Sequence, residues 1–185
     1  MIWLSNSTLQ RLRDQLREHG QRPSMMALVG LGASVSPEVA EGLAAVAEYG
    51  PLTEAMYLMM SADGQVSNEE REVLRGALRT LSSDSIRSTH VESLLDSAAK
   101  SVAEHGRDAR MTEVSLLLKD DPARAEVAFV LAAAIAFADN AIADGENDTL
   151  NDLAEGLGID EARAAALLDG VEADLSSRAS SQDAK

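Results

Sequence analysis

The longest apolar run in the chain covers residues 127–138 and has 12 residues between Glu126 and Asp139. A helix that crosses a bilayer needs roughly 20 apolar residues, so we expect no membrane span. Asp121 and Pro122 precede the run, and an Asp cap followed by proline at the first helical position is typical of a helix start. The run therefore predicts an apolar helix with one face in the core. That face comprises Val127, Val130, Leu131, Ala134, Ile135 and Ala138.

The composition favours helices over strands. Aromatic residues make up only 3% of the chain, and Ala, Leu, Glu and Asp dominate, whereas sheets are rich in Val, Ile, Tyr and Phe. A length of 185 residues suits one domain. We therefore predict an all-α, single-domain helical bundle of about seven to eight helices.

Caps, glycines and prolines divide the chain further. Gly50 and Pro51 predict a helix break, and the segment 89–92 (Thr-His-Val-Glu) is a capping-box pattern that predicts the start of a helix ending near Gly106. The periodicity of residues 21–34 leaves their conformation open. We expect N-terminal helices over 1–50 that pack on the core, a helical domain over 51–175 and a disordered Ser-rich tail over 176–185.

The charge is strongly negative. The chain has 16 Lys and Arg against 31 Asp and Glu, a formal charge of −15, which excludes nucleic-acid binding by a basic face. Residues 120–185 hold 15 of the acids and four of the bases. From Asp139 to Glu161 there are eight acidic residues and no base. This run is either a solvated face or a docking surface for a protein partner with a basic surface.

The chain lacks the residues that several kinds of chemistry require. Cysteine is absent, which excludes disulfides and thiolate sites, and fits the reducing cytoplasm. The N-terminal residues have no signal-peptide pattern. His19, His90 and His105 fall on separate predicted helices, and no serine stands in a nucleophile elbow. We therefore predict a cytoplasmic protein that is not an enzyme.

An internal repeat becomes visible when the sequence is shifted by 76 residues, which aligns residues 61–70 with 137–146. The identical pairs are Ala62 and Ala138, Asp63 and Asp139, Glu70 and Glu146, and Leu74 and Leu150. In each copy an apolar helix ends in Ala-Asp, a short turn follows, and a Glu stands seven residues after the Asp. We predict two pseudo-symmetric helix hairpins, at about 52–81 and 122–157.

The repeated carboxylates are candidate metal ligands. An Asp in the last turn of a helix faces the negative end of the helix dipole, so it needs hydrogen-bond donors or a cation beside it. Carboxylate oxygens suit Ca²⁺, Mg²⁺ or Mn²⁺. The candidate ligands are Asp63, Glu70, Asp139 and Glu146. Alternatively, Glu70 completes a capping box with Ser67; Ala143 cannot do this for Glu146, which makes the second pair the better candidate.

These segments resemble the TerB-like family, named for tellurite-resistance proteins. The resemblance covers residues 52–168, and its best copy is the segment 62–70, Ala-Asp-Gly-Gln-Val-Ser-Asn-Glu-Glu. It implies an all-helical bundle with pseudo-two-fold halves and a divalent cation held by the Asp and Glu of each copy. The second copy has Asn140 where the family favours Gly, and Asn tolerates the same turn.

Two functions stay open at this point. The resemblance implies a non-enzymatic module of the tellurite-resistance and stress-response type that binds a divalent cation and acts through protein partners. The alternative is a protein-interaction scaffold with an acidic docking face and no functional metal. The sequence leaves the oligomeric state open.

Overall fold

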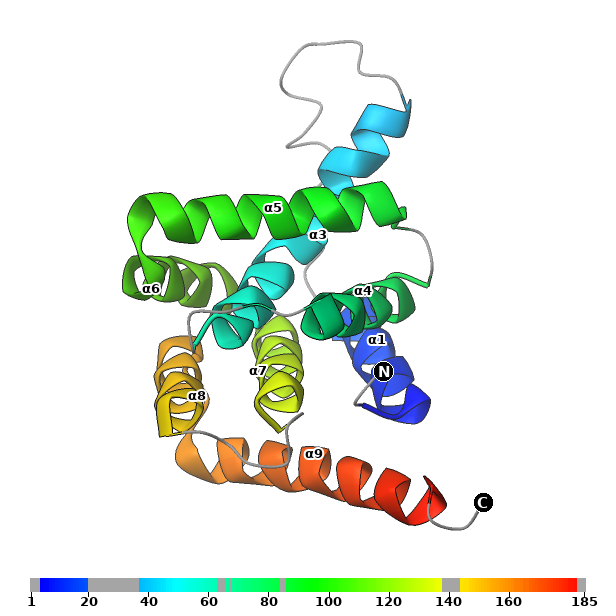
Figure 1. Cartoon of the computed structure of the whole chain (residues 1–185), viewed down its shortest axis with the longest axis vertical. Coiled ribbons are helices and arrows are strands. Elements are labelled where there is room, and N and C mark those ends of the chain that lie inside the picture. Colours follow the sequence, from blue (N-terminus) through cyan, green and yellow to red (C-terminus); the bar gives the residue numbers. More distant parts are fainter. Residues whose placement is uncertain are drawn as a thin grey trace.

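The chain is all-helical in a computed structural model that describes residues 4–19, 37–62, 66, 68–83, 86–137 and 144–182. These residues form eight helices and no strand, as the composition predicted (Figure 1). The helices are α1 (Asn6–His19), α3 (Pro37–Met60), α4 (Asn68–Leu81), α5 (Ser88–His105), α6 (Arg107–Leu118), α7 (Pro122–Ala136), α8 (Asp144–Leu157) and α9 (Glu161–Gln182).

Helix α7 lies in the middle of the bundle, with α5 and α9 on opposite sides of it (Figure 1). Our prediction of a single buried face was wrong, because Ala123, Ala125 and every residue from 127 to 136 are buried. Ala138 lies outside the described residues. The many alanines explain the difference: small side chains let α1, α3, α8 and α9 all pack against α7.

Helix α3 runs through Gly50 and Pro51 without the predicted break. Proline lacks the N–H that would bond to the carbonyl one turn earlier. The carbonyl that loses this partner is that of Ala47. Side-chain donors reach the next two carbonyls: the Arg124 guanidinium donates to the Glu48 carbonyl, and Thr53 Oγ1 donates to the Tyr49 carbonyl at 2.8 Å. Because α3 also packs along α5 and α7, tertiary contacts hold the helix together across the proline.

Helix α5 begins at Ser88, before the predicted capping box, and its N-cap Arg87 makes no side-chain cap bond. Thr89 lies inside the helix and so cannot be its N-cap, and Glu92 pairs with Arg75 of α4. The other end agrees with the prediction: the helix stops at His105, and Gly106 follows with a φ of +83°.

Two local caps separate the last two helices of the chain. Asp160 Oδ1 accepts the Arg163 backbone N–H at 2.8 Å. Gly158 ends α8 with a φ of +71°, and its N–H donates to the Glu155 carbonyl. The N–H of Ile159 reaches the Ala154 carbonyl, which completes a Schellman motif. Helix α9 then continues to Gln182.

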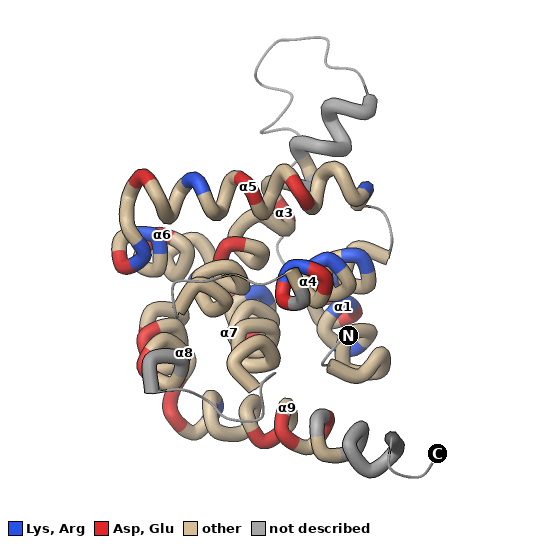
Figure 2. The backbone as a smooth tube through the Cα atoms, viewed as in Figure 1, with Lys and Arg blue, Asp and Glu red and all other residues tan. Residues whose placement is uncertain are grey.

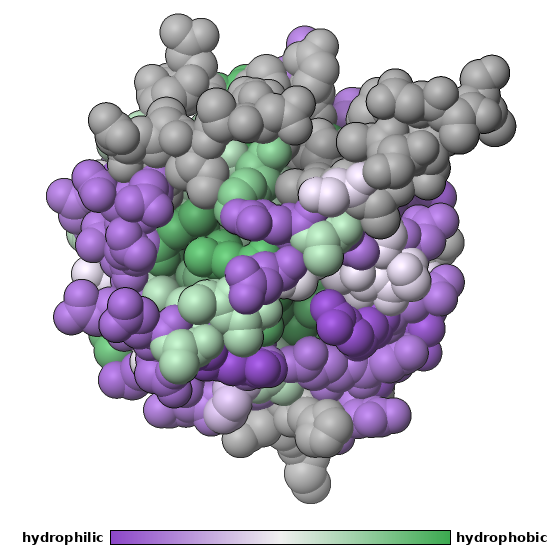
Figure 3. Space-filling view, turned by 90° about the horizontal axis from the view of Figure 1, so that it is seen from below, coloured by the Kyte–Doolittle hydropathy of each residue, from purple (hydrophilic) through white to green (hydrophobic). Residues whose placement is uncertain are grey.

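The surface charges are unevenly distributed over the bundle. Figure 2 shows acidic residues without basic ones along α8, while arginines gather on α1 and α4. On the face where α9 is nearest to the viewer, hydrophilic side chains surround a smaller apolar area (Figure 3). No described helix is long and apolar enough to cross a bilayer.

Candidate functional site

The two repeated segments 61–70 and 137–146 are called the acidic turns. The helix ends that flank them are separated by the 76 residues predicted for the repeat. Helices α3 and α7 end at Met60 and Ala136, and helices α4 and α8 begin at Asn68 and Asp144. Both pairs of residues are 76 positions apart. Each second helix has 14 residues. Glu70 and Glu146 are therefore each the third residue of their helix.

The structure describes the side chain of one of the four predicted ligands. Glu70 is half-buried in the first turn of α4 and has an interaction partner. Glu146 lies in the first turn of α8, but its side chain is outside the described part of the chain, as are Asp63 and Asp139. The described residues contain no group of three or more His, Cys, Asp or Glu that could hold a metal. The ligand set therefore stays a prediction.

Arg107, at the start of α6, connects the segments that carry the two acidic motifs. Its Nε donates to the Leu58 carbonyl at 3.3 Å, in the last turn of α3. Its Nη2 donates to the buried Thr149 hydroxyl of α8. Leu58 precedes the first motif by four residues, and Thr149 follows Glu146 by three. One guanidinium thus fixes the end of α3 relative to the N-terminal half of α8.

The comparison with protein families decides the assignment. A family model described as Tellurite resistance protein TerB matches residues 52–169, more than half of the chain. The chain belongs to the TerB family. The matched region begins inside α3 and ends inside α9, so it contains both helix hairpins and the helices α5 and α6 between them. The comparisons with curated proteins and with solved structures gave no match.

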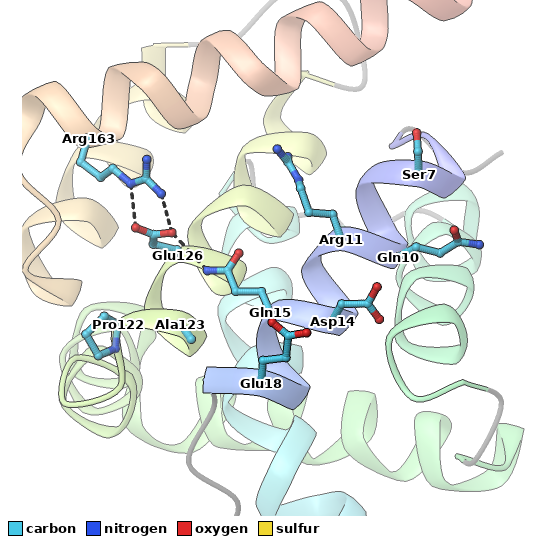
Figure 4. A pocket seen from close by; sticks show the side chains of 10 residues that line it. All are labelled: Ser7, Gln10, Arg11, Asp14, Gln15, Glu18, Pro122, Ala123, Glu126 and Arg163. Carbon is cyan, nitrogen blue, oxygen red and sulfur yellow. Dashed lines mark hydrogen bonds and ion pairs between the residues drawn. The ribbon is translucent and has the colours of Figure 1, made fainter.

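A second polar feature of this TerB protein is a groove of about 790 Å³ between α1, α7 and α9 (Figure 4). Arg163 of α9 holds Glu126 of α7 through two hydrogen bonds of 2.7 Å, and Gln15 of α1 donates to the same carboxylate at 3.1 Å. The hydrogen bond from Arg163 is the main cause that lowers the pKa of Glu126, against the opposing effect of burial.

This groove carries charges of both signs. Arg11 extends from α1 toward α7 and α9, while Asp14 and Glu18 lie on the same helix (Figure 4). Such a mixture favours neither anions nor cations. We therefore assign the groove a structural role: its Glu126–Arg163 pair joins α9 to α7.

The sequence reasoning missed Arg107 and the surface between α6 and α8. Arg107 gave no local signal, because its partners lie 49 and 42 positions away. A signal did exist for the surface: Leu116 and Leu117 fall off the helical stripe formed by Met111, Val114 and Leu118. The structure leaves these two leucines exposed.

Proposed function

We propose that this TerB-family chain is a non-enzymatic module of the tellurite-resistance and stress-response type that binds a divalent cation through its two acidic turns. The observation that carries the proposal is the equivalent position of Glu70 and Glu146, each third in a 14-residue helix that follows a helix end in the same 76-residue register. Family membership supports the tellurite-resistance type.

The donor set fits a hard cation. Asp63, Glu70, Asp139 and Glu146 would supply carboxylate oxygens, which Ca²⁺, Mg²⁺ and Mn²⁺ prefer, and the chain has no cysteine that would favour a softer metal. A bound cation would neutralise these carboxylates and cross-link the turns.

The position of Arg107 favours one shared site over two separate ones. Its guanidinium contacts both the last turn of α3 and the N-terminal half of α8, so the helix before the first motif and the helix that carries Glu146 meet at one side chain. A shared site would give a stoichiometry of one cation per chain, and separate sites would give two.

Calorimetric titration with Ca²⁺, Mg²⁺ and Mn²⁺, each on metal-free full-length protein, tests the proposal. The first variant combines Asp139→Asn with Glu146→Gln, and the second combines Asp63→Asn with Glu70→Gln. Asp169→Asn with Glu172→Gln is the matched control, because it removes two exposed carboxylates from α9. Thermal unfolding is followed in parallel, since a cation at 100 times its Kd stabilises the folded chain by about 2.7 kcal/mol.

We expect at least one of the three cations to bind and raise the melting temperature of the wild type and the control. The Asp139/Glu146 variant should lose this response. Absence of binding and of stabilisation by all three cations would contradict the proposal and favour the scaffold alternative. An equal loss of affinity in the control would show that binding reflects net charge alone.

A further inference from the structure

A groove of about 420 Å³ lies between α6 and α8. Its lining combines acidic, hydroxyl and apolar side chains with one basic side chain, that of Arg107, which donates to Leu58 and Thr149. The residues that matter here are Asp108, Thr112, Ser115 and Leu116 on α6, and Asp152 and Glu155 on α8. The two helices pack directly against each other beneath the groove.

The α8 side of the groove is a stripe of carboxylates. Asp148, Asp152 and Glu155 are all exposed, and their spacing of four and three residues puts them on one face of the helix. With a rise of about 1.5 Å per residue, the stripe extends over roughly 10 Å. No Lys or Arg lies on α8, so no basic side chain of the same helix neutralises the charge of the stripe (Figure 2).

The α6 side adds an apolar surface. Leu116 is 52% exposed and Leu117 is 63% exposed, while their neighbours Val114 and Leu118 are fully buried. Leu116 lines the groove, whereas Leu117 lies on another face of α6. An exposed leucine beside charged residues suits a surface that a protein partner covers, because a small ion would leave Leu116 in water.

A buried hydroxyl lies in the wall of the same groove. Ser115 is 3% exposed, and its Oγ is the one buried side-chain polar atom in the described part of the chain without a hydrogen-bond partner. Gly156 of α8 lies against it, so closely that a Cβ there would stand 2.5 Å from the hydroxyl oxygen. This hydroxyl oxygen is closed off from solvent and faces Gly156, so it belongs to the packing of α6 against α8.

We propose that the groove between α6 and α8 binds a basic amphipathic helix of a partner protein. Apolar residues of that helix would cover Leu116. Lys or Arg residues spaced three and four positions apart would lie along Asp148, Asp152 and Glu155, matching the spacing of the carboxylates. The charge of −15 on the whole chain draws such a basic segment toward this surface and repels acidic ones.

The test uses a synthetic amphipathic helix of roughly 16 residues, long enough to be helical, with leucines on one face and lysines beside them. Two control peptides replace the lysines with Glu or the leucines with Ser. The protein variants are Leu116→Ser and the pair Asp152→Asn with Glu155→Gln. Asp169→Asn with Glu172→Gln on α9 is the matched control, because it removes the same residue types at the same spacing. Fluorescence anisotropy gives the Kd, and circular dichroism checks the fold.

We expect Leu116→Ser and the α8 pair each to weaken binding of the Leu/Lys peptide by about tenfold or more, and the α9 pair to change it by less than about threefold. Neither control peptide should bind. Equal loss in the α8 and α9 pairs would overturn the proposal, because attraction would then depend on net charge alone. Full affinity in Leu116→Ser would also overturn it. If the protein self-associates in light scattering and Leu116→Ser abolishes this, the occupant is a second copy and our assignment of a basic partner helix is wrong.

Discussion

Arg110 of α6 holds Glu54 of α3 through two parallel hydrogen bonds. The Nε to Oε1 distance is 2.6 Å and the Nη2 to Oε2 distance is 2.9 Å. Both side chains are largely buried, with 15% and 12% of their surfaces exposed. The hydrogen bond to Glu54 is the main cause that raises the pKa of Arg110. The pair therefore joins two helices through charges that water does little to screen.

Removing Glu54 leaves Arg110 paired only with the more exposed Glu113, and removing Arg110 takes away the guanidinium that pairs with the buried Glu54. We expect Glu54→Gln or Arg110→Met to lower the free energy of unfolding by about 2–4 kcal/mol, and the double variant Glu54→Leu with Arg110→Met to cost less than the sum. Urea denaturation measures the cycle. Arg13→Gln, which breaks the exposed pair with Asp14, should cost less than about 1 kcal/mol. A Glu54→Gln cost no larger than that of Arg13→Gln would contradict the expectation.

Gly156 permits the close approach of α8 to α6. A Cβ at this position would stand 2.5 Å from Ser115 Oγ and 2.8 Å from Ser115 Cβ. Gly156→Ala should therefore destabilise the chain by about 1–3 kcal/mol although alanine favours helices. Ser115→Gly should relieve the clash in the double variant. Gly170→Ala on α9 is the control: nothing lies within 4 Å of its Cβ, and it should stabilise by about 0.5–1 kcal/mol. Thermal unfolding compares the variants. Equal effects of Gly156→Ala and Gly170→Ala on the melting temperature would show that there is no clash with Ser115.

The Glu126–Arg163 pair should make stability depend on pH. Because Arg163 lowers the pKa of Glu126 in the folded chain, the pair stabilises the fold above the ordinary Glu range, and this contribution is lost as the pH falls through the folded-state pKa. Glu126→Gln should cost about 0.5–1 kcal/mol near pH 7, since Arg163 is 51% exposed, and progressively less as the pH falls below the ordinary Glu range. Melting curves from pH 7 downward, with Glu172→Gln as the control, measure the difference. If the difference in melting temperature between the wild type and Glu126→Gln stayed constant across this pH range, the Glu126–Arg163 pair would not be the source of the pH dependence.

Arg107 should stabilise the contact between α3 and α8. Arg107→Lys keeps the charge but cannot reach two acceptors in different directions, so we expect a loss of about 1–2 kcal/mol. Thr149→Val removes one acceptor and should cost about 1 kcal/mol. Hydrogen exchange of the amides in α8 should become faster in both variants. Unchanged exchange in α8 would show that Arg107 contributes nothing to this contact.

Local signals predicted the fold class and the helix ends at Asp121 and Gly106. Both residues act within one turn of the chain, so their effects could be inferred from neighbouring residues. The errors have a tertiary cause. Pro51 lies within a continuous helix that packs along α5 and α7, and such tertiary contacts are invisible to a sequence pattern.

Of the candidate site, the sequence predicted only the repeated motif and the equivalent positions of its two glutamates. The 76-residue offset predicted that Glu70 and Glu146 stand at equivalent helix positions, and the helix bounds agree with it. The contacts of Arg107 and the crossing of α6 with α8 at Ser115 and Gly156 join residues about 40 or more positions apart. No periodicity within one helix indicates such pairs.

The burial of α7 on every side has a consequence for how the chain can be divided. The two hairpins of the predicted repeat are not autonomous units, because α3 of the first packs along α7 of the second, and α1 and α9 cover the same helix. Cutting the chain in the α5–α6 region would expose apolar surface on both fragments. We would expect neither fragment to fold by itself, and the two to regain helicity only when mixed, as complementing halves of one core.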